Sequence, residues 1–192
     1  MTTPGIPPYR VLAVCTGNIC RSPAVERLLA ITLDASVEAR SAGTQALVGE
    51  PIHPPMARFL TEVGSDFDDF RATQLSESAV RQADLILALT RDHRASVVDL
   101  WPGAVRRTFT LTEFARVLQM VDPTYLPTRA PAAERLASAL PQAAVLRGQL
   151  VPPSPEGDDV MDPYQRDEEV YREAFTIIRE AVTSIADVVQ RR

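Results

Sequence analysis

Short apolar runs alternate with helix-like patterns along most of the chain, and this alternation restricts the fold more than any other feature of the sequence. The runs at 10–14, 37–41, 84–89 and 105–110 have the length and composition of buried strands. Apolar residues at helical spacing mark the segments 24–33, 56–63, 77–83, 92–100, 112–120, 132–146 and 168–190, with Thr112 expected as a cap. The alternation predicts one α/β domain over 1–192, with a parallel sheet covered by helices on both faces.

The loop between the first strand and the first helix has the composition of an anion-binding site. It reads Cys15-Thr16-Gly17-Asn18-Ile19-Cys20-Arg21-Ser22-Pro23. We expect Ser22 to cap the helix and Pro23 to occupy its first position. Gly17 is expected to take a backbone angle closed to other residues, and Asn18 tolerates a left-handed conformation. Successive N–H groups would then converge on a phosphate at the N-terminus of the helix.

The same loop combines a nucleophile with a phosphate ligand. A helix N-terminus and a nearby arginine favour the thiolate form of Cys15, which is the nucleophilic form. The planar fork of Arg21 can grip two phosphate oxygens, and Ser22 can donate a hydrogen bond to the Cys15 sulfur. These residues point to phosphoryl transfer onto sulfur and hydrolysis of a cysteinyl-phosphate. The alternative is that Cys15 and Cys20 are small core residues at the end of a buried strand.

Composition and charge narrow the class of protein. The chain has 192 residues, 45% of them hydrophobic, and a net charge of −5, which argues against a nucleic-acid partner. It contains neither an apolar run long enough to span a bilayer nor an N-terminal signal pattern, so we predict a cytoplasmic protein. Two cysteines within one loop indicate reduced thiols rather than a structural disulfide. Metal-ligand spacings are absent, and with only His53 and His93 we expect no metal and no cofactor.

The motif resembles the phosphate loop of the low-molecular-weight protein tyrosine phosphatases. Further similar stretches are Ser41-Ala42-Gly43-Thr44, the run at 84–89, and Asp162-Pro163-Tyr164 before the last helix. The resemblance covers most of 9–118 and 158–188. It implies a three-layer α/β sandwich with a central four-stranded parallel sheet, helices on both faces and a phosphate loop after the first strand.

The resemblance also implies the site residues and the substrate. Cys15, Arg21 and Asp162 would be catalytic, with Ser22, Ser41 and Tyr164 in support. Phosphate would bind to the loop residues Thr16, Gly17, Asn18, Ile19, Cys20, Arg21 and Ser22. The expected partner is a phosphotyrosine protein, and the sequence makes no prediction of oligomeric state.

The general acid has to be chosen from two Asp-Pro pairs. Asp122 opens a proline-rich segment, where turn initiation explains it. Asp162 precedes an aromatic residue and the last helix, as the resemblance requires, and would protonate the leaving phenolate before activating water. The alternative for Asp162 is a turn residue ahead of a helix.

Several positions depart from the pattern of the family. Phe70 stands where relatives usually have a histidine, so the hydrogen bonds that brace Asn18 must be built differently, with Ser41 and Ser22 available. Relatives often carry an aromatic where this chain has Leu47 and Val48, which leaves Tyr164 as the main aromatic wall. An aliphatic loop of this kind resembles bacterial members that act in tyrosine-kinase and exopolysaccharide regulation.

Three functions are alternatives to tyrosine phosphatase activity for this chain. Arsenate reductases share a similar loop but need a third, distant cysteine to relay electrons, and this chain lacks one. Protein arginine phosphatases usually carry Thr where Ile19 stands, and a bulky Ile favours a planar phenol over a phosphoguanidinium. A non-catalytic phosphate-binding module is disfavoured because nucleophile, arginine and acid are all present.

Two features have open interpretations. Residues 122–158 are rich in proline and partly helical, and form an insertion that is either a helical excursion with a loop or a lid or partner surface near Asp162. Cys20 is either a small buried residue at the helix start or, as the resemblance implies, the partner of Cys15 in a protective disulfide under oxidation.

Overall fold

The strands form one parallel sheet in the order β2-β1-β3-β4. The computed structural model describes residues 7–149 and 157–190. The strands are β1 (Tyr9–Cys15), β2 (Val37–Gly43), β3 (Leu85–Ala88) and β4 (Thr108–Thr110). Because β1 is central and parallel to both neighbours, its last residue, Cys15, lies at the carboxyl edge of the sheet, opposite Gly43 of β2. Parallel sheets bind ligands at this edge, and the predicted four-stranded sheet is confirmed.

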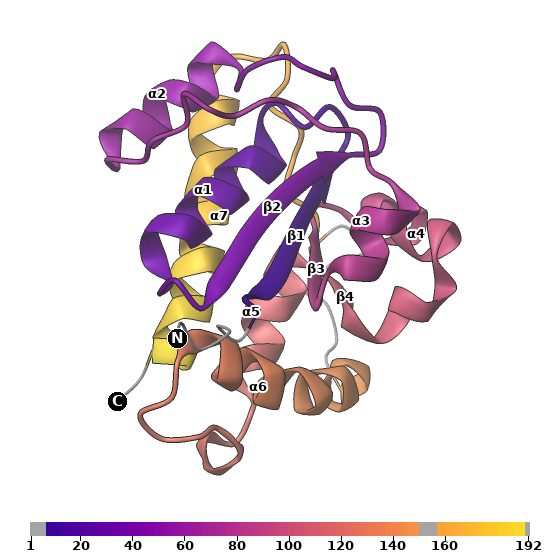
Figure 1. Cartoon of the computed structure of the whole chain (residues 1–192). Helices are drawn as coiled ribbons and strands as arrows, with labels where there is room; N and C mark the ends of the chain where they lie inside the picture. The colour runs from indigo at the N-terminus through magenta and orange to yellow at the C-terminus, as the bar shows by residue number, and fades with distance from the viewer. Residues whose placement is uncertain (1–6, 150–156, 191–192) are drawn as a thin grey trace, which may run out of the picture.

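Helices cover both faces of the sheet (Figure 1). They are α1 (Arg21–Thr32), α2 (Pro54–Glu62), α3 (Glu77–Gln82), α4 (Arg91–Leu100), α5 (Leu111–Gln119), α6 (Ala132–Leu146) and α7 (Glu168–Gln190). The helices α1 and α7 lie on one side of the strands, and α3 and α4 on the other. The predicted spans of α6 and α7 are confirmed to the residue.

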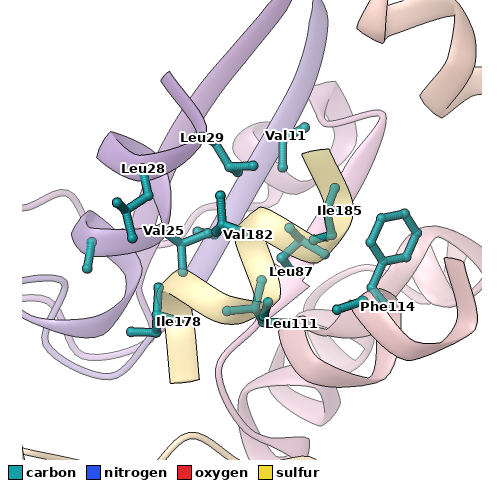
Figure 2. Close-up of a cluster of buried hydrophobic side chains, with 14 of the residues drawn as sticks. Val11, Val25, Leu28, Leu29, Leu87, Leu111, Phe114, Ile178, Val182 and Ile185 are labelled. Carbon is teal, nitrogen blue, oxygen red and sulfur yellow. The ribbon is translucent and has the colours of Figure 1, made fainter. Parts of the chain in front are cut away.

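Alternating residues of β1 supply the two cores. Val11 and Ala13 face the larger core, which α1, α5 and α7 complete, whereas Leu12 and Val14 face a smaller core with Val80 of α3. Figure 2 shows part of the larger core, with side chains from two strands and three helices: Val11, Leu87, Val25, Leu28, Leu29, Leu111, Phe114, Ile178, Val182 and Ile185. Burial on both faces makes β1 apolar throughout its centre, as expected of a parallel strand.

The structure corrects the predicted boundaries of β4, α5 and α1. The expected strand at 105–110 is strand only over Thr108–Thr110, because pairing with β3 begins at Ile86 and Thr108. The preceding Pro102–Arg107 form a 3₁₀ helix. Helix α5 is capped by Thr110 instead of Thr112, since Thr110 and Glu113 complete a capping box. Helix α1 begins at Arg21, so Ser22 lies inside it and is not its cap.

Residues 122–149 of the insertion lie away from the loop that follows β1 (Figure 1). Helix α6 packs at the end of the sheet opposite the loop that follows β1 (Figure 1). The backbone N–H groups of Ala132 and Ala133 donate to Asp34 and Ser36, in the turn before β2, at 2.9 and 3.0 Å. The lid alternative is therefore wrong for 122–149, while 150–156 lie outside the described residues. Asp122 accepts the N–H of Thr124 in a short 3₁₀ turn (Pro123–Tyr125), followed later by a second at Arg147–Gln149.

None of the helices that the structure describes is both long and apolar enough to cross a membrane.

Candidate active site

The loop after β1 brings a buried serine to the cysteine. Ser22 Oγ lies 2.9 Å from Cys15 Sγ, and both side chains are almost fully buried. Because Ser22 sits in the first turn of α1, its hydroxyl turns back toward the end of β1. The N-cap of α1 is Cys20, which makes no side-chain capping bond. The first backbone N–H groups of the helix are thus left for a ligand.

The backbone of Asn18, in the loop after β1, has the left-handed conformation. Its φ is 55°, whereas Gly17 does not have a positive φ, so the prediction for Gly17 is wrong. The Asn18 amide donates to Ser22 Oγ and Ser41 Oγ at 2.9 and 2.8 Å, and its oxygen accepts the Thr73 N–H at 2.7 Å. Since a backbone N–H can only donate, the Thr73 contact fixes the orientation of the amide. Both serines then accept from Asn18, so the Ser22 proton is available to Cys15 Sγ at 2.9 Å, a shorter contact than the one to the Ala42 carbonyl at 3.5 Å.

A buried carboxyl group ends this chain of hydrogen bonds. Ser41 Oγ donates to Glu26 Oε2 at 2.6 Å, and burial raises the pKa of Glu26. Phe70, which replaces the histidine of the family, is buried with the guanidinium of Arg27 above its ring. The bracing of Asn18 is thus built from serine hydroxyls and a backbone N–H.

A glycine on β2 allows the loop to pack closely. A Cβ on Gly43 would lie 2.4 Å from the Thr16 carbonyl oxygen. The backbone N–H of Gln45 donates to that same oxygen at 3.0 Å, and the N–H of Leu47 donates to the Gly17 carbonyl at 3.0 Å. The close approach requires glycine at position 43, and it ties the segment after β2 to the loop after β1.

Arg21 and Asp162 meet at the mouth of the loop although they are distant in sequence. The guanidinium of Arg21 is buried, donates to the Val160 carbonyl at 3.0 Å and pairs with Asp162 Oδ2 at 2.6 Å. The Asp162 side chain is 52% exposed, and its Oδ1 accepts the Tyr164 N–H at 3.2 Å. One carboxylate oxygen of Asp162 therefore contacts Arg21, the residue predicted to bind phosphate, while the Asp162 side chain stays open to solvent.

These residues surround one cleft. Its walls are formed by the loop from Cys15 to Arg21 and by Gln45, Leu47, Asp162 and Tyr164. Leu47 and Tyr164 are 43% and 40% exposed and provide apolar surface. Of the predicted site residues, Ser22 and Ser41 do not line the cleft and lie behind the loop, where they contact Asn18.

Sequence reasoning missed the role of His93 in the architecture of the site. Its Nε2 lies 2.9 Å from Thr16 Oγ1, and its Nδ1 lies 2.8 Å from Thr90 Oγ1. Burial, together with the charge of Arg21, lowers the pKa of His93 to about 4. The ring is therefore neutral at pH 7 and orients the Thr16 hydroxyl. No local pattern marks this contact, because it joins α4 to a loop far away in the sequence.

The histidines do not form a metal centre. Among residues 7–149 and 157–190, no three His, Cys, Asp or Glu side chains are grouped so that they could hold a metal ion. His53 instead contacts Tyr171 of α7, with 2.9 Å between Nδ1 and the hydroxyl.

Comparisons with known proteins agree with this architecture. Residues 10–128 match the model of the family described as low molecular weight phosphotyrosine protein phosphatase. A protein-arginine-phosphatase of Geobacillus stearothermophilus is 38% identical over 107 residues, 56% of this chain and 72% of that protein. A probable low molecular weight protein-tyrosine-phosphatase, EpsP, of Ralstonia nicotianae is 36% identical over 113 residues, 59% of this chain and 77% of that protein.

The fold extends the likeness beyond the sequence match. The structure of the YwlE arginine phosphatase from Geobacillus stearothermophilus superposes with a TM-score of 0.69 at 28% identity, covering 95% of this chain and 94% of that one. The chain therefore belongs to the low molecular weight phosphotyrosine protein phosphatase family, a family of hydrolases.

Proposed function

We propose that this protein hydrolyses phosphotyrosine on proteins through a cysteinyl-phosphate intermediate. The observation that carries the proposal is the convergence of Cys15, Arg21 and Asp162 on one cleft. Cys15 is the proposed nucleophile, Arg21 the ligand of the phosphoryl oxygens, and Asp162 the general acid. The backbone of 16–22 at the N-terminus of α1 is the proposed cradle of the phosphate.

In the first step, the Cys15 thiolate attacks phosphorus. An S–P bond forms, the P–O bond to the phenol breaks, and Asp162 donates its proton to the departing phenolic oxygen. The Ser22 hydroxyl, 2.9 Å from Cys15 Sγ, stabilises the thiolate before the attack. Arg21 pairs with the equatorial oxygens, where negative charge is held in the transition state.

In the second step, water attacks the phosphorus of the intermediate. The Asp162 carboxylate takes a proton from the water, the S–P bond breaks, and Cys15 leaves as thiolate. Asp162 is half-exposed, so water can reach its carboxylate once the phenol has left. Phosphate departs and the loop is restored.

The walls of the cleft support an aromatic substrate. Tyr164 and Leu47 offer partly exposed apolar faces beside a narrow loop, which suits a flat phenol. Ile19, also at the cleft, adds apolar bulk in the loop. A phosphoserine side chain has no aromatic ring to contact these walls, so phosphotyrosine is the favoured substrate.

A second candidate is phosphoarginine hydrolysis. It is supported by the Geobacillus stearothermophilus protein-arginine-phosphatase, which is 38% identical over 107 residues. The same nucleophile and arginine would serve that reaction. Ile19 weighs against it, because a polar guanidinium gains nothing from contact with an apolar side chain.

The cellular setting is proposed from the aliphatic loop at Leu47 and Val48, which resembles that of bacterial members of the family. We place the protein in the cytoplasm, acting on the products of a bacterial tyrosine kinase in exopolysaccharide regulation. We propose that the chain, including the insertion at 122–158, forms one phosphatase domain.

Parallel hydrolysis of phosphotyrosine, phosphoserine and phosphoarginine peptides tests the proposal. We expect turnover of the phosphotyrosine peptide to exceed the other two and to vanish in Cys15→Ser. Preference for phosphoarginine would replace the proposed substrate by the second candidate. Absence of turnover on all three would contradict the enzymatic proposal itself.

A further inference from the structure

One side chain beside the cleft is not used by the proposed chemistry. His53 lies in the segment before α2 and is partly buried. Its backbone N–H donates to the Ile19 carbonyl at 2.8 Å, so its main chain is fixed to the loop that follows β1. Its own carbonyl accepts the N–H groups of Met56 and Ala57 at the start of α2. The position of the imidazole is therefore tied to that of the loop.

The imidazole of His53 contacts two tyrosines on different segments. It stacks on Tyr171 of α7, with ring centroids 5.8 Å apart and planes at 13°. It meets the ring of Tyr164 edge to face, with centroids 5.4 Å apart and planes at 76°. Tyr171 is buried, whereas Tyr164 is exposed and lines the cleft. His53 thus connects the wall of the cleft to the core of the protein.

Hydrogen bonds fix the orientation of the imidazole. Cys20 Sγ donates to the Tyr171 hydroxyl at 4.0 Å, and that hydroxyl lies 2.9 Å from His53 Nδ1. The hydroxyl thus lies between the thiol and Nδ1 and joins α7 to the imidazole by a hydrogen bond. Burial raises the pKa of Cys20 to about 12 and also raises that of Tyr171, so both groups keep their protons at neutral pH. Tyr171 therefore holds the His53 ring by stacking and by a hydrogen bond, and the ring also contacts Tyr164.

We propose that His53 is a positioning residue that sets the preference of the site for aryl phosphates by holding the Tyr164 ring in place as the wall of the cleft. The inference rests on the proposed function, because it assigns the aromatic group of the substrate to that wall. The phosphoryl group is held by the loop and by Arg21, neither of which accepts a hydrogen bond from the imidazole. Without the imidazole, the exposed ring of Tyr164 loses lateral support, and ordering it on binding costs affinity.

Binding of two phosphate analogues tests the proposal without turnover. Benzylphosphonate carries an aromatic group, and inorganic phosphate does not. We expect His53→Ala to raise the Kd of benzylphosphonate about five-fold, the loss of one aromatic pair. The Kd of inorganic phosphate should stay unchanged. Isothermal titration calorimetry measures both constants.

Two conservative variants separate the contacts of the imidazole. His53→Phe keeps a ring against Tyr164 but offers no acceptor to the Tyr171 hydroxyl; we expect lower thermal stability and wild-type affinity for benzylphosphonate. His53→Asn keeps an acceptor but removes the ring; we expect the weakened affinity of His53→Ala. Glu62→Ala, an exposed change at the end of α2, is the matched control.

Two outcomes would overturn the role of His53. One is an equal loss of affinity for both analogues in His53→Ala, which would indicate damage to the phosphate loop. The other is a loss in His53→Phe as large as in His53→Ala. If the expected binding pattern appears while the wild type fails to hydrolyse phosphotyrosine peptides, the proposed function fails and the role of His53 stands.

Discussion

Replacing Ser22 by Ala removes the hydrogen bond to the proposed nucleophile. Ser22 Oγ lies 2.9 Å from Cys15 Sγ and accepts from the Asn18 amide, and the sulfur is nearer to its proton than the Ala42 carbonyl at 3.5 Å. A hydrogen bond to a charged group contributes about 1.5–3 kcal/mol. Each 1.4 kcal/mol is about a tenfold change in an equilibrium or a rate. The thiolate of Cys15 should therefore be disfavoured about ten- to hundredfold in Ser22→Ala.

Alkylation by iodoacetate measures this effect directly. The rate of Cys15 alkylation at a fixed pH near neutrality should fall in Ser22→Ala, and kcat should fall about ten- to hundredfold. Because burial raises the pKa of Cys20 to about 12, alkylation near neutral pH reports Cys15. The Asn18 amide also loses an acceptor in a buried site, so the free energy of unfolding should fall by about 1–3 kcal/mol.

The chain offers a matched control in Ser65. It is 7% exposed, and its buried hydroxyl oxygen makes no hydrogen bond within the described part of the chain. Ser65→Ala should leave the rate of Cys15 alkylation and kcat unchanged and should not lower the free energy of unfolding. An unchanged rate of Cys15 alkylation in Ser22→Ala, with the protein folded, would refute the argument that this hydroxyl stabilises the thiolate.

Three further predictions concern the acid, the second cysteine and a buried histidine. Asp162→Asn should reduce kcat about 10²- to 10⁴-fold for aryl phosphates with poor leaving groups and far less for good ones; equal losses in a leaving-group series would remove Asp162 as general acid. Peroxide inactivation should be reversed by dithiothreitol in the wild type and be irreversible in Cys20→Ser; identical recovery in both would contradict protection by a disulfide with Cys15. Because the pKa of His93 falls from 6.5 to about 4 on folding, the unfolded chain binds the extra proton between these values, so stability should decrease as pH falls through this range. Urea unfolding should show a smaller decrease in His93→Gln, and an identical slope would contradict the assignment.

Local chemistry explains which elements were predictable. The spans of α6 and α7 follow from apolar spacing within each segment. The N-cap of α5 is also predictable from the sequence, because Thr110 and Glu113 have the spacing of a capping box. The predicted cap, Thr112, is wrong. The start of β4 could not be predicted from its own residues, since a strand begins only where β3 offers a partner.

The loop after β1 shows the same division within the site. Its strand, its tight turn and the helix that follows arise from neighbouring residues, so the sequence was sufficient to place Cys15 before a helix N-terminus. The turn still differed in detail, because the left-handed residue is Asn18, held by Ser22, Ser41 and Thr73. Two of those three partners come from distant segments.

By itself, the sequence determined the order of strands and helices and the loop that presents Cys15 and Arg21, because torsional preferences and short-range hydrogen bonds depend on adjacent residues. Only the tertiary structure decided that Asp162 pairs with Arg21 at 2.6 Å, that His93 reaches Thr16, and that His53 lies between two tyrosines. These contacts join segments far apart in the chain. Their geometry is set by how α4, α7 and the loops pack around the sheet, which no local pattern records.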